Sequence, residues 1–161
     1  YTGEQLWSVL RKSYHPSPCL YMMKRAVLTE GNVRFPEGII HEDEWFTLKL
    51  FTLVESMVYV NQALYQRRYR LASTMTDRSN LQKLRSFESY KEILHRMTEL
   101  YHDLEQPAER KFVKRQMLSI YSGLEQLEVP AERRQELREF KEITLVDRLL
   151  LDVRRLKQRW L

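Results

Sequence analysis

The side chains with the clearest capacity for chemistry lie in residues 32–46, where carboxylates gather around a histidine: Glu37, His41, Glu42, Asp43 and Glu44. A Pro-Glu-Gly turn precedes most of them, and an apolar periodic segment follows the acids at once. Turn residues before acids, and acids before an apolar repeat, predict a loop that leads into the N-terminus of a helix. The helix dipole and free backbone N–H groups stabilise carboxylates at that point. The simplest interpretation is therefore an acidic helix cap.

The same acids allow other chemistry. A carboxylate kept ionised at a helix N-terminus can act as a general base. A zinc-protease motif is excluded, because Trp45 stands where a second histidine would follow His41 by four residues. Several carboxylates could surround a hard cation, but we predict no metal site in this segment.

A second polar motif follows about twenty residues later, in residues 64–73. Residues 64–69 predict a strand, and alternation along it places Arg68 and Arg70 on one face. Two guanidinium groups and the hydroxyl of Ser73 suit the negative charge of a diphosphate. The alternative is an edge strand whose charges prevent aggregation, and we prefer that role for Arg67.

Together the two motifs resemble the C-terminal half of a bacterial inverting glycosyltransferase of family 2, of the GT-A fold type. That family carries a phenylalanine, a glycine turn and a Glu-Asp pair that opens a helix, and then a strand ending in Tyr-x-Tyr-Arg-x-Arg-x-x-Ser. The matching residues are Phe35, Gly38, Glu42 and Asp43, and then Tyr65, Arg68, Arg70 and Ser73. Arg67 replaces the second aromatic of the pattern, and the resemblance covers roughly residues 3 to 80.

The resemblance implies a role for each matching residue. Asp43 would be the base that removes the acceptor hydroxyl proton, with Glu42 as its neighbour and the second candidate. Arg68, Arg70 and Ser73 would approach the diphosphate leaving group. The donor would be a nucleotide sugar and the acceptor a saccharide or a lipid-linked saccharide, in surface polysaccharide synthesis at the cytoplasmic face of the membrane.

One part of the family pattern is absent from this sequence. The family binds the nucleotide on an N-terminal α/β half and holds a divalent metal, Mn or Mg, through an Asp-x-Asp motif. No Asp-x-Asp occurs here, and the chain begins without Met. We therefore expect a piece of a longer protein that lacks the N-terminal half, and we expect this piece alone to be inactive.

Composition favours helix. The chain has 161 residues and a net charge of +5, and its second half is rich in Leu, Glu, Arg and Lys. Acids alternate with the basic residues throughout that half, which is typical of solvated helix faces and argues against nucleic-acid binding. Cys19 is the only cysteine, so no internal disulfide is possible, and we expect it to be a small buried hydrophobe.

Periodicity predicts a mainly α protein with one short antiparallel strand pair, an α+β fold. The expected helices span 2–14, 24–29, 43–56, 81–104, 112–127 and 140–160; the expected strands span 19–23, 57–60 and 64–69. The last three helices have short proline-containing links and predict an antiparallel bundle.

We place a boundary at residue 80, between an acceptor-side part (1–80) and a helical C-terminal extension (81–161). The extension could pack on the catalytic part, pair with a second subunit, or rest on a membrane through its basic last turn, residues 154–160. The rival interpretation of the whole chain is a non-enzymatic helical protein-interaction module, in which Glu42 and Asp43 are only cap charges.

Overall fold

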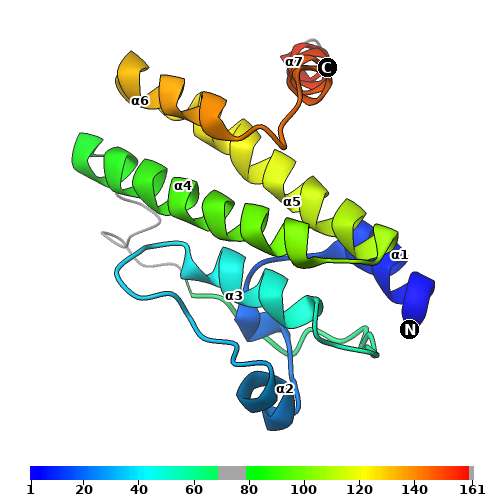
Figure 1. Cartoon of the computed structure of the whole chain (residues 1–161). Helices are drawn as coiled ribbons and strands as arrows, with labels where there is room; N and C mark the ends of the chain where they lie inside the picture. The colour runs from blue at the N-terminus through cyan, green and yellow to red at the C-terminus, as the bar shows by residue number, and fades with distance from the viewer. Residues whose placement is uncertain (69–78, 160–161) are drawn as a thin grey trace.

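The computed structural model describes residues 1–68 and 79–159, with side chains described as far as residue 153. Within these ranges the chain is mainly helical and contains no strand (Figure 1). Its elements are α1 (Gly3–Ser13), η1 (Pro18–Leu20), α2 (Arg25–Glu30), α3 (Glu42–Phe51), α4 (Asn80–Asp103), α5 (Pro107–Gln126), α6 (Ala131–Gln135), η2 (Glu136–Glu139) and α7 (Leu145–Arg159).

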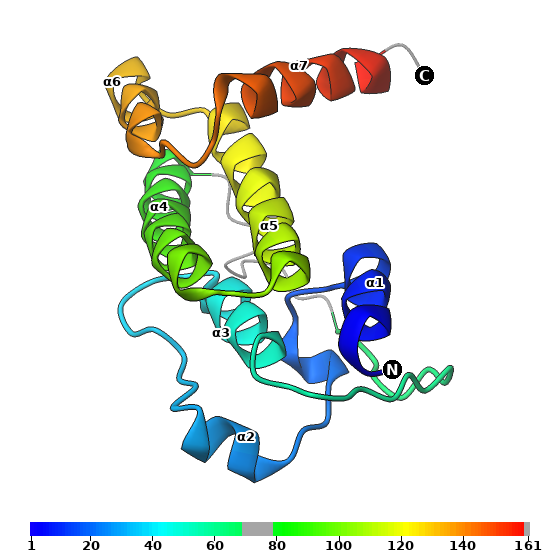
Figure 2. The same ribbon diagram turned by 45° about the vertical axis from the view of Figure 1, so that its right-hand side comes forward.

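An antiparallel hairpin of α4 and α5 forms the centre of the molecule (Figures 1 and 2). Local chemistry fixes the start of both helices. The Ser79 hydroxyl accepts a hydrogen bond from the Gln82 N–H at 3.2 Å, as an N-cap residue does. Pro107 occupies the first position of α5, where its missing N–H costs nothing. Helix α1 packs on α5, and α3 packs on α4.

The main hydrophobic core joins residues from both sides of residue 80. Trp7 and Tyr14, from α1 and the residue that follows it, place their rings 5.5 and 5.3 Å from the ring of Phe112 in α5. The other buried members include Leu6, Leu10, Leu48, Phe51, Phe87, Ile93, Leu94, Met97, Met117, Leu124, Leu137, Phe140 and Ile143. The division into residues 1–80 and 81–161 stays a prediction, but the two parts share one core.

The predicted strand pair is not formed in the described residues. Residues 57–68 form an irregular segment in which Val58, Tyr59 and Leu64 are exposed. The N–H groups of Gln62 and Leu64 donate to carbonyl oxygens only two residues earlier, as in tight turns. The one bridge nearby joins Thr2 to Ser56. Strand propensity reflects how well β-branched and aromatic side chains fit a half-buried sheet surface, and the described part of the chain supplies no sheet for them. The expected α+β class is therefore wrong for these residues, which are helical or irregular.

The buried strand expected at residues 19–23 is also wrong. Pro18 begins the short 3-10 turn η1, and Cys19 and Met22 are exposed. The Tyr21 hydroxyl donates a hydrogen bond to the His15 carbonyl at 2.7 Å, which closes the loop. An apolar run of five residues cannot by itself distinguish a buried strand from such a loop.

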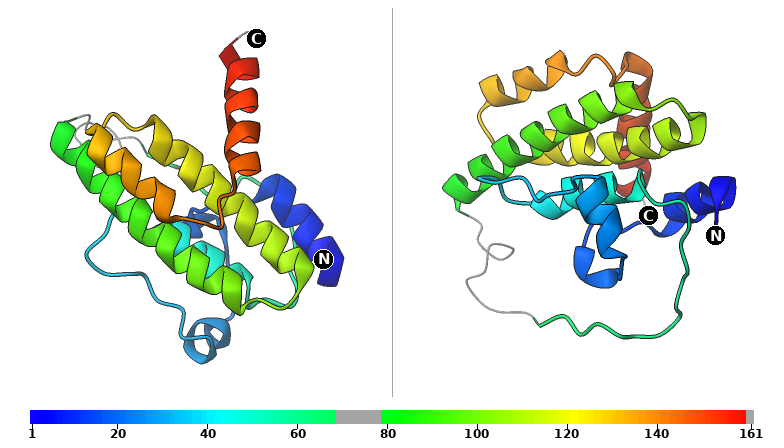
Figure 3. Two further views of the ribbon diagram at one scale, coloured as in Figure 1. Left: turned by 45° about the horizontal axis from the view of Figure 1, so that its top comes forward. Right: turned by 60° about the horizontal axis from the view of Figure 1, so that its bottom comes forward.

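The third helix of the extension starts later than predicted. Phe140 and Ile143 are buried in the link before it, and α7 begins at Leu145. Thr144 and Asp147 form a reciprocal cap: the Asp147 carboxylate accepts from the Thr144 N–H at 2.9 Å, and the Thr144 hydroxyl accepts from the Asp147 N–H at 3.2 Å. Helix α7 then leaves the hairpin at a steep angle instead of completing an antiparallel bundle (Figures 2 and 3).

Replacing two glycines by alanine should have opposite effects on stability. A Cβ on Gly31 would lie 2.4 Å from Leu53 Cδ1 and 2.8 Å from the Val27 carbonyl oxygen, whereas a Cβ on Gly123 in α5 would meet nothing within 4 Å. We expect Gly31→Ala to lower the free energy of unfolding by about 1–3 kcal/mol and Gly123→Ala to raise it by about 0.5–1 kcal/mol. Urea unfolding of both variants measures this, and a change of the same sign would contradict it.

Candidate functional site

The three consecutive acids open α3, as the sequence predicts. His41 precedes the helix with φ of 64°, in the left-handed region, and Glu42, Asp43 and Glu44 form the first turn. The Glu44 N–H donates to Asp43 Oδ1 at 3.1 Å. The same N–H group also donates to the His41 carbonyl oxygen at 3.1 Å, so the Asp43 carboxylate is a second acceptor for a donor of the first turn. This contact is the one expected of an acid at a helix N-terminus.

The loop before α3 is fixed to α4 by polar and ring contacts. The His41 ring stacks on Tyr90, with ring centres 4.2 Å apart and planes 8° from parallel. His41 Nε2 lies 3.2 Å from the Ser86 hydroxyl oxygen, and the Ile40 N–H donates to the buried Ser89 hydroxyl at 3.1 Å. Residues 86, 89 and 90 lie on one face of α4 because three and four residues make about one turn. These contacts hold the acidic turn against α4.

Burial changes the ionisation of this group. Desolvation, followed by the negative charge of Glu42, raises the pKa of Asp43. Desolvation and the charge of Asp43 raise the pKa of Glu44 to about 7. Desolvation lowers the pKa of His41 despite the nearby acids. The site therefore holds a carboxylate with enhanced basicity beside a second carboxyl group that takes up a proton near neutral pH.

Two tyrosines complete the site, and sequence reasoning did not assign them to it. The Tyr14 hydroxyl is buried without a hydrogen-bond partner among the described residues, and burial together with the charge of Glu44 raises its pKa. Tyr90 has its pKa raised to about 12, by burial and then by Glu44 and Asp43. Both phenols stay protonated at neutral pH. Tyr14 and Tyr90 lie far from the acids in the sequence, so no local pattern connected them with the site.

Glu44 predicts a pH dependence of stability. Its folded-state pKa of about 7 exceeds its ordinary value, so between these two values the folded state holds a proton that the unfolded chain has released, and stability falls as pH rises. We expect the Glu44 contribution to fall by up to about 3 kcal/mol between pH 4 and pH 8. Glu44→Gln should remove that fall and exceed wild type in stability at pH 8 only. Urea unfolding between pH 4 and pH 8 measures these free energies, and Glu42→Gln, at an exposed position, is the control. Parallel curves of stability against pH for wild type and Glu44→Gln would refute the prediction.

The second predicted motif is only partly described. Arg68 is exposed at the end of the irregular segment 57–68, and no described contact joins it to Asp43 or Glu42. Arg70 and Ser73 lie outside the described residues. Glu42 is exposed at the first position of α3. The convergence of Arg68, Arg70 and Ser73 on Asp43 thus stays a prediction.

The described residues do not fit a metal. No group of three or more His, Cys, Asp or Glu side chains within them could hold an ion. The divalent metal that the resemblance implies stays an expectation for the parent protein.

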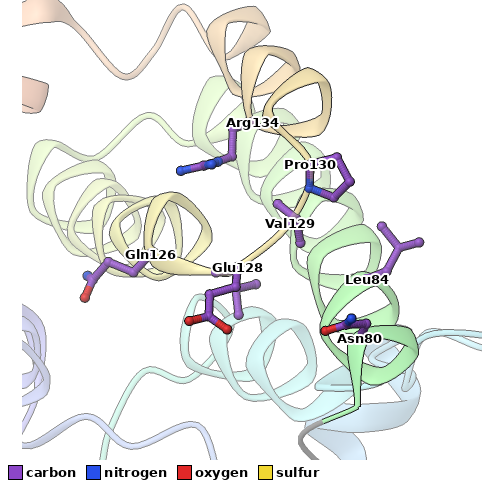
Figure 4. A pocket seen from close by; sticks show the side chains of 8 residues that line it. Asn80, Leu84, Gln126, Glu128, Val129, Pro130 and Arg134 are labelled. Carbon is purple, nitrogen blue, oxygen red and sulfur yellow. The ribbon is translucent and has the colours of Figure 1, made fainter.

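A separate hollow lies between the start of α4 and the link from α5 to α6 (Figure 4). Its volume is about 510 Å³. Lys83 and Glu128 pair beside it. Its walls are formed by Asn80, Leu84, Gln126, Leu127, Glu128, Val129, Pro130 and Arg134. None of the predicted site residues lines it, so it adds nothing to the chemistry at α3.

Comparison with known proteins adds no relative to this picture. No family model, no curated protein and no solved structure matches the chain. Within the described ranges, no helix combines the length and the apolar character needed to cross a bilayer.

Proposed function

We propose that this chain is the acceptor-side half of a bacterial inverting glycosyltransferase of family 2, and that Asp43 is its general base. The parent enzyme would transfer a sugar from a nucleotide diphosphate to a saccharide or lipid-linked acceptor. The observation that carries the proposal is the state of Asp43: a half-buried carboxylate at a helix N-terminus whose pKa is raised. The ordered motif of residues 35–43 and 65–73 supports the family.

The chemistry of inverting transfer suits this carboxylate. The acceptor oxygen attacks the anomeric carbon and must lose its proton as the new bond forms. A raised pKa makes Asp43 a stronger proton acceptor, while the N–H groups and dipole at the start of α3 still favour its ionised form at neutral pH. His41 and Tyr90, stacked on each other, position the turn that carries Asp43. Glu42 remains the second candidate for the base.

The exposed side chains of residues 57–68 support the view that a partner sheet belongs here. This irregular segment exposes Val58, Tyr59, Val60 and Leu64 in a sequence with strong strand propensity. We propose that it joins a sheet supplied by the N-terminal half of the parent, which would bring Arg68, Arg70 and Ser73 to the diphosphate. The GT-A fold, the nucleotide-sugar site and the metal then belong to the assembled parent at the cytoplasmic face of the membrane.

The second candidate is a non-enzymatic helical interaction module. It is favoured by the absence of any strand in the described part of the chain and by the exposed apolar side chains of α7. In that case the acids at α3 serve only as cap charges. It leaves unexplained why Asp43 and Glu44 are partly buried near Tyr90 of α4, at the cost of a raised pKa in both.

The test is release of nucleoside diphosphate from a panel of UDP-sugars by the full parent protein, beside this chain alone. We expect the parent to release UDP in the presence of its acceptor and the isolated chain to release none. Activity of the isolated chain equal to that of the parent would refute the fragment proposal. A parent that releases UDP from no donor, across a panel of saccharide and lipid-linked acceptors, would favour the interaction module.

A further inference from the structure

Helix α7 contacts the rest of the molecule through one side only. Leu151 is 8% exposed and belongs to the main core. Beside it, the Arg148 guanidinium lies 5.3 Å from the centre of the Tyr121 ring. Asp147 forms an ion pair with Lys114 at 2.9 Å. One leucine and two charged residues thus hold α7 against α5.

The opposite side of α7 carries an apolar stripe that nothing covers. We call it the outer stripe: Leu145, Val146, Leu149, Leu150 and Val153, which are 49–77% exposed. At 3.6 residues per turn these five positions fall within an arc of about 140°, and Leu151 lies nearly opposite its centre. Figure 3 shows α7 projecting from the hairpin, and the exposed fractions of the five side chains mean that no described element covers the stripe. The helix therefore presents its apolar face away from the body.

Positive charge is concentrated in the same helix. Residues 154–159 contain three arginines and one lysine and no acid, and Trp160 follows them. An exposed apolar stripe next to a cluster of cations is typical of helices that lie in the interface of an anionic membrane. We propose that α7 binds the surface of an anionic lipid bilayer, with the outer stripe in the acyl boundary and residues 154–159 supplying attraction to the headgroup phosphates.

A second copy of the chain is a weaker occupant for the outer stripe. A parallel pair of α7 helices would place two sets of four cations side by side. A lipid surface instead attracts those cations through its headgroup phosphates. This inference depends on α7 alone and not on the transferase proposal.

The test is co-sedimentation of the chain with vesicles of phosphatidylcholine, alone or mixed with phosphatidylglycerol. We expect binding to the mixed vesicles that weakens as salt is added, and little binding to phosphatidylcholine alone. Leu149→Glu should lower the affinity about tenfold or more, because it removes an apolar contact and adds a repelled charge. Leu81→Glu, at a leucine of α4 that is even more exposed than Leu149, should leave binding unchanged.

A charge variant tests the electrostatic part. Arg154→Glu combined with Arg155→Glu should lower affinity for the mixed vesicles by about tenfold or more. Three results would overturn the proposal. One is equal binding by wild type and Leu149→Glu, or no binding at all. Another is a dimer in sedimentation that Leu149→Glu converts to a monomer while neither form binds vesicles. The third is a full parent protein that fails to bind where the isolated chain binds, since other parts of the parent would then cover the stripe.

Discussion

Replacing Asp43 by asparagine in the proposed parent transferase should lower the turnover rate about a hundredfold or more, the size of effect that loss of a general base produces. Asparagine has nearly the same shape as aspartate and cannot take a proton from the acceptor hydroxyl. The rate is measured as nucleoside diphosphate released under saturating donor and acceptor. Because the base acts in the chemical step, the loss should fall on kcat more than on KM.

The structure makes this substitution a clean test. Asp43 accepts a hydrogen bond from the Glu44 N–H at 3.1 Å, and the amide oxygen of asparagine can accept the same bond. The variant also removes a half-buried charge whose pKa is raised by burial. We therefore expect the fold to be at least as stable as wild type, so the lost activity would not reflect unfolding.

Glu42→Gln is the matched control, because it removes the adjacent carboxylate at an exposed position of the same turn. It should lower kcat by less than about tenfold. The opposite ranking, with Glu42→Gln inactive and Asp43→Asn active, would assign the base to Glu42. Full activity in both variants would leave the acids as helix-cap charges and would contradict the proposed base.

The pH profile gives an independent reading of the same carboxylate. The acid limb of kcat/KM reports the pKa of the essential base in the free enzyme. Because burial raises the pKa of Asp43, activity should begin to fall at a higher pH than an ordinary aspartate would require. The residual activity of Asp43→Asn should show no such acid limb in its plot of kcat/KM against pH.

The sequence predicts those features of the structure that depend on residues close together in the chain. The amphipathic repeats of α4 and α5 and the acidic start of α3 are fixed by residues within one or two turns, and both are confirmed. The site needed more than this. The His41 ring lies within hydrogen-bond distance of Ser86 and stacks on Tyr90, both in α4. Tyr14, at the end of α1, lies near enough to Glu44 and Asp43 for their charges to raise its pKa. No short-range pattern records such contacts.

The errors share one physical cause. A strand exists only when another strand accepts its hydrogen bonds, so the propensity of Val58, Tyr59 and Val60 could not decide their structure without the sheet. An apolar helical stripe, likewise, does not say what it faces. From the sequence alone, the last helix could pack on the catalytic part, on a second subunit or on a membrane. In the structure Phe140 and Ile143, before α7, enter the core, while Leu149 and its neighbours point outward.

Truncating Phe112 to alanine should have the largest effect on stability, lowering the free energy of unfolding by about 3–5 kcal/mol. Its side chain is fully buried in α5, and its ring meets those of Trp7 and Tyr14 from the α1 region. The loss combines the burial of an aromatic ring with the cavity left behind. Urea unfolding measures it, and Leu81→Ala, at an exposed position of α4, should change stability by no more than about 0.5 kcal/mol.

The same experiment decides whether the chain is one folding unit. Residues 1–80 and 81–161 meet through Phe112, so a shared core requires both parts to unfold together. Trp7 and Trp45, both before residue 80, supply most of the fluorescence change, and far-UV circular dichroism is dominated by α4 and α5. Coincident curves from the two probes, both shifted by Phe112→Ala, establish one cooperative unit. Separate curves, with only one shifted, would mean that the helical extension folds by itself and that residue 80 is a true domain boundary.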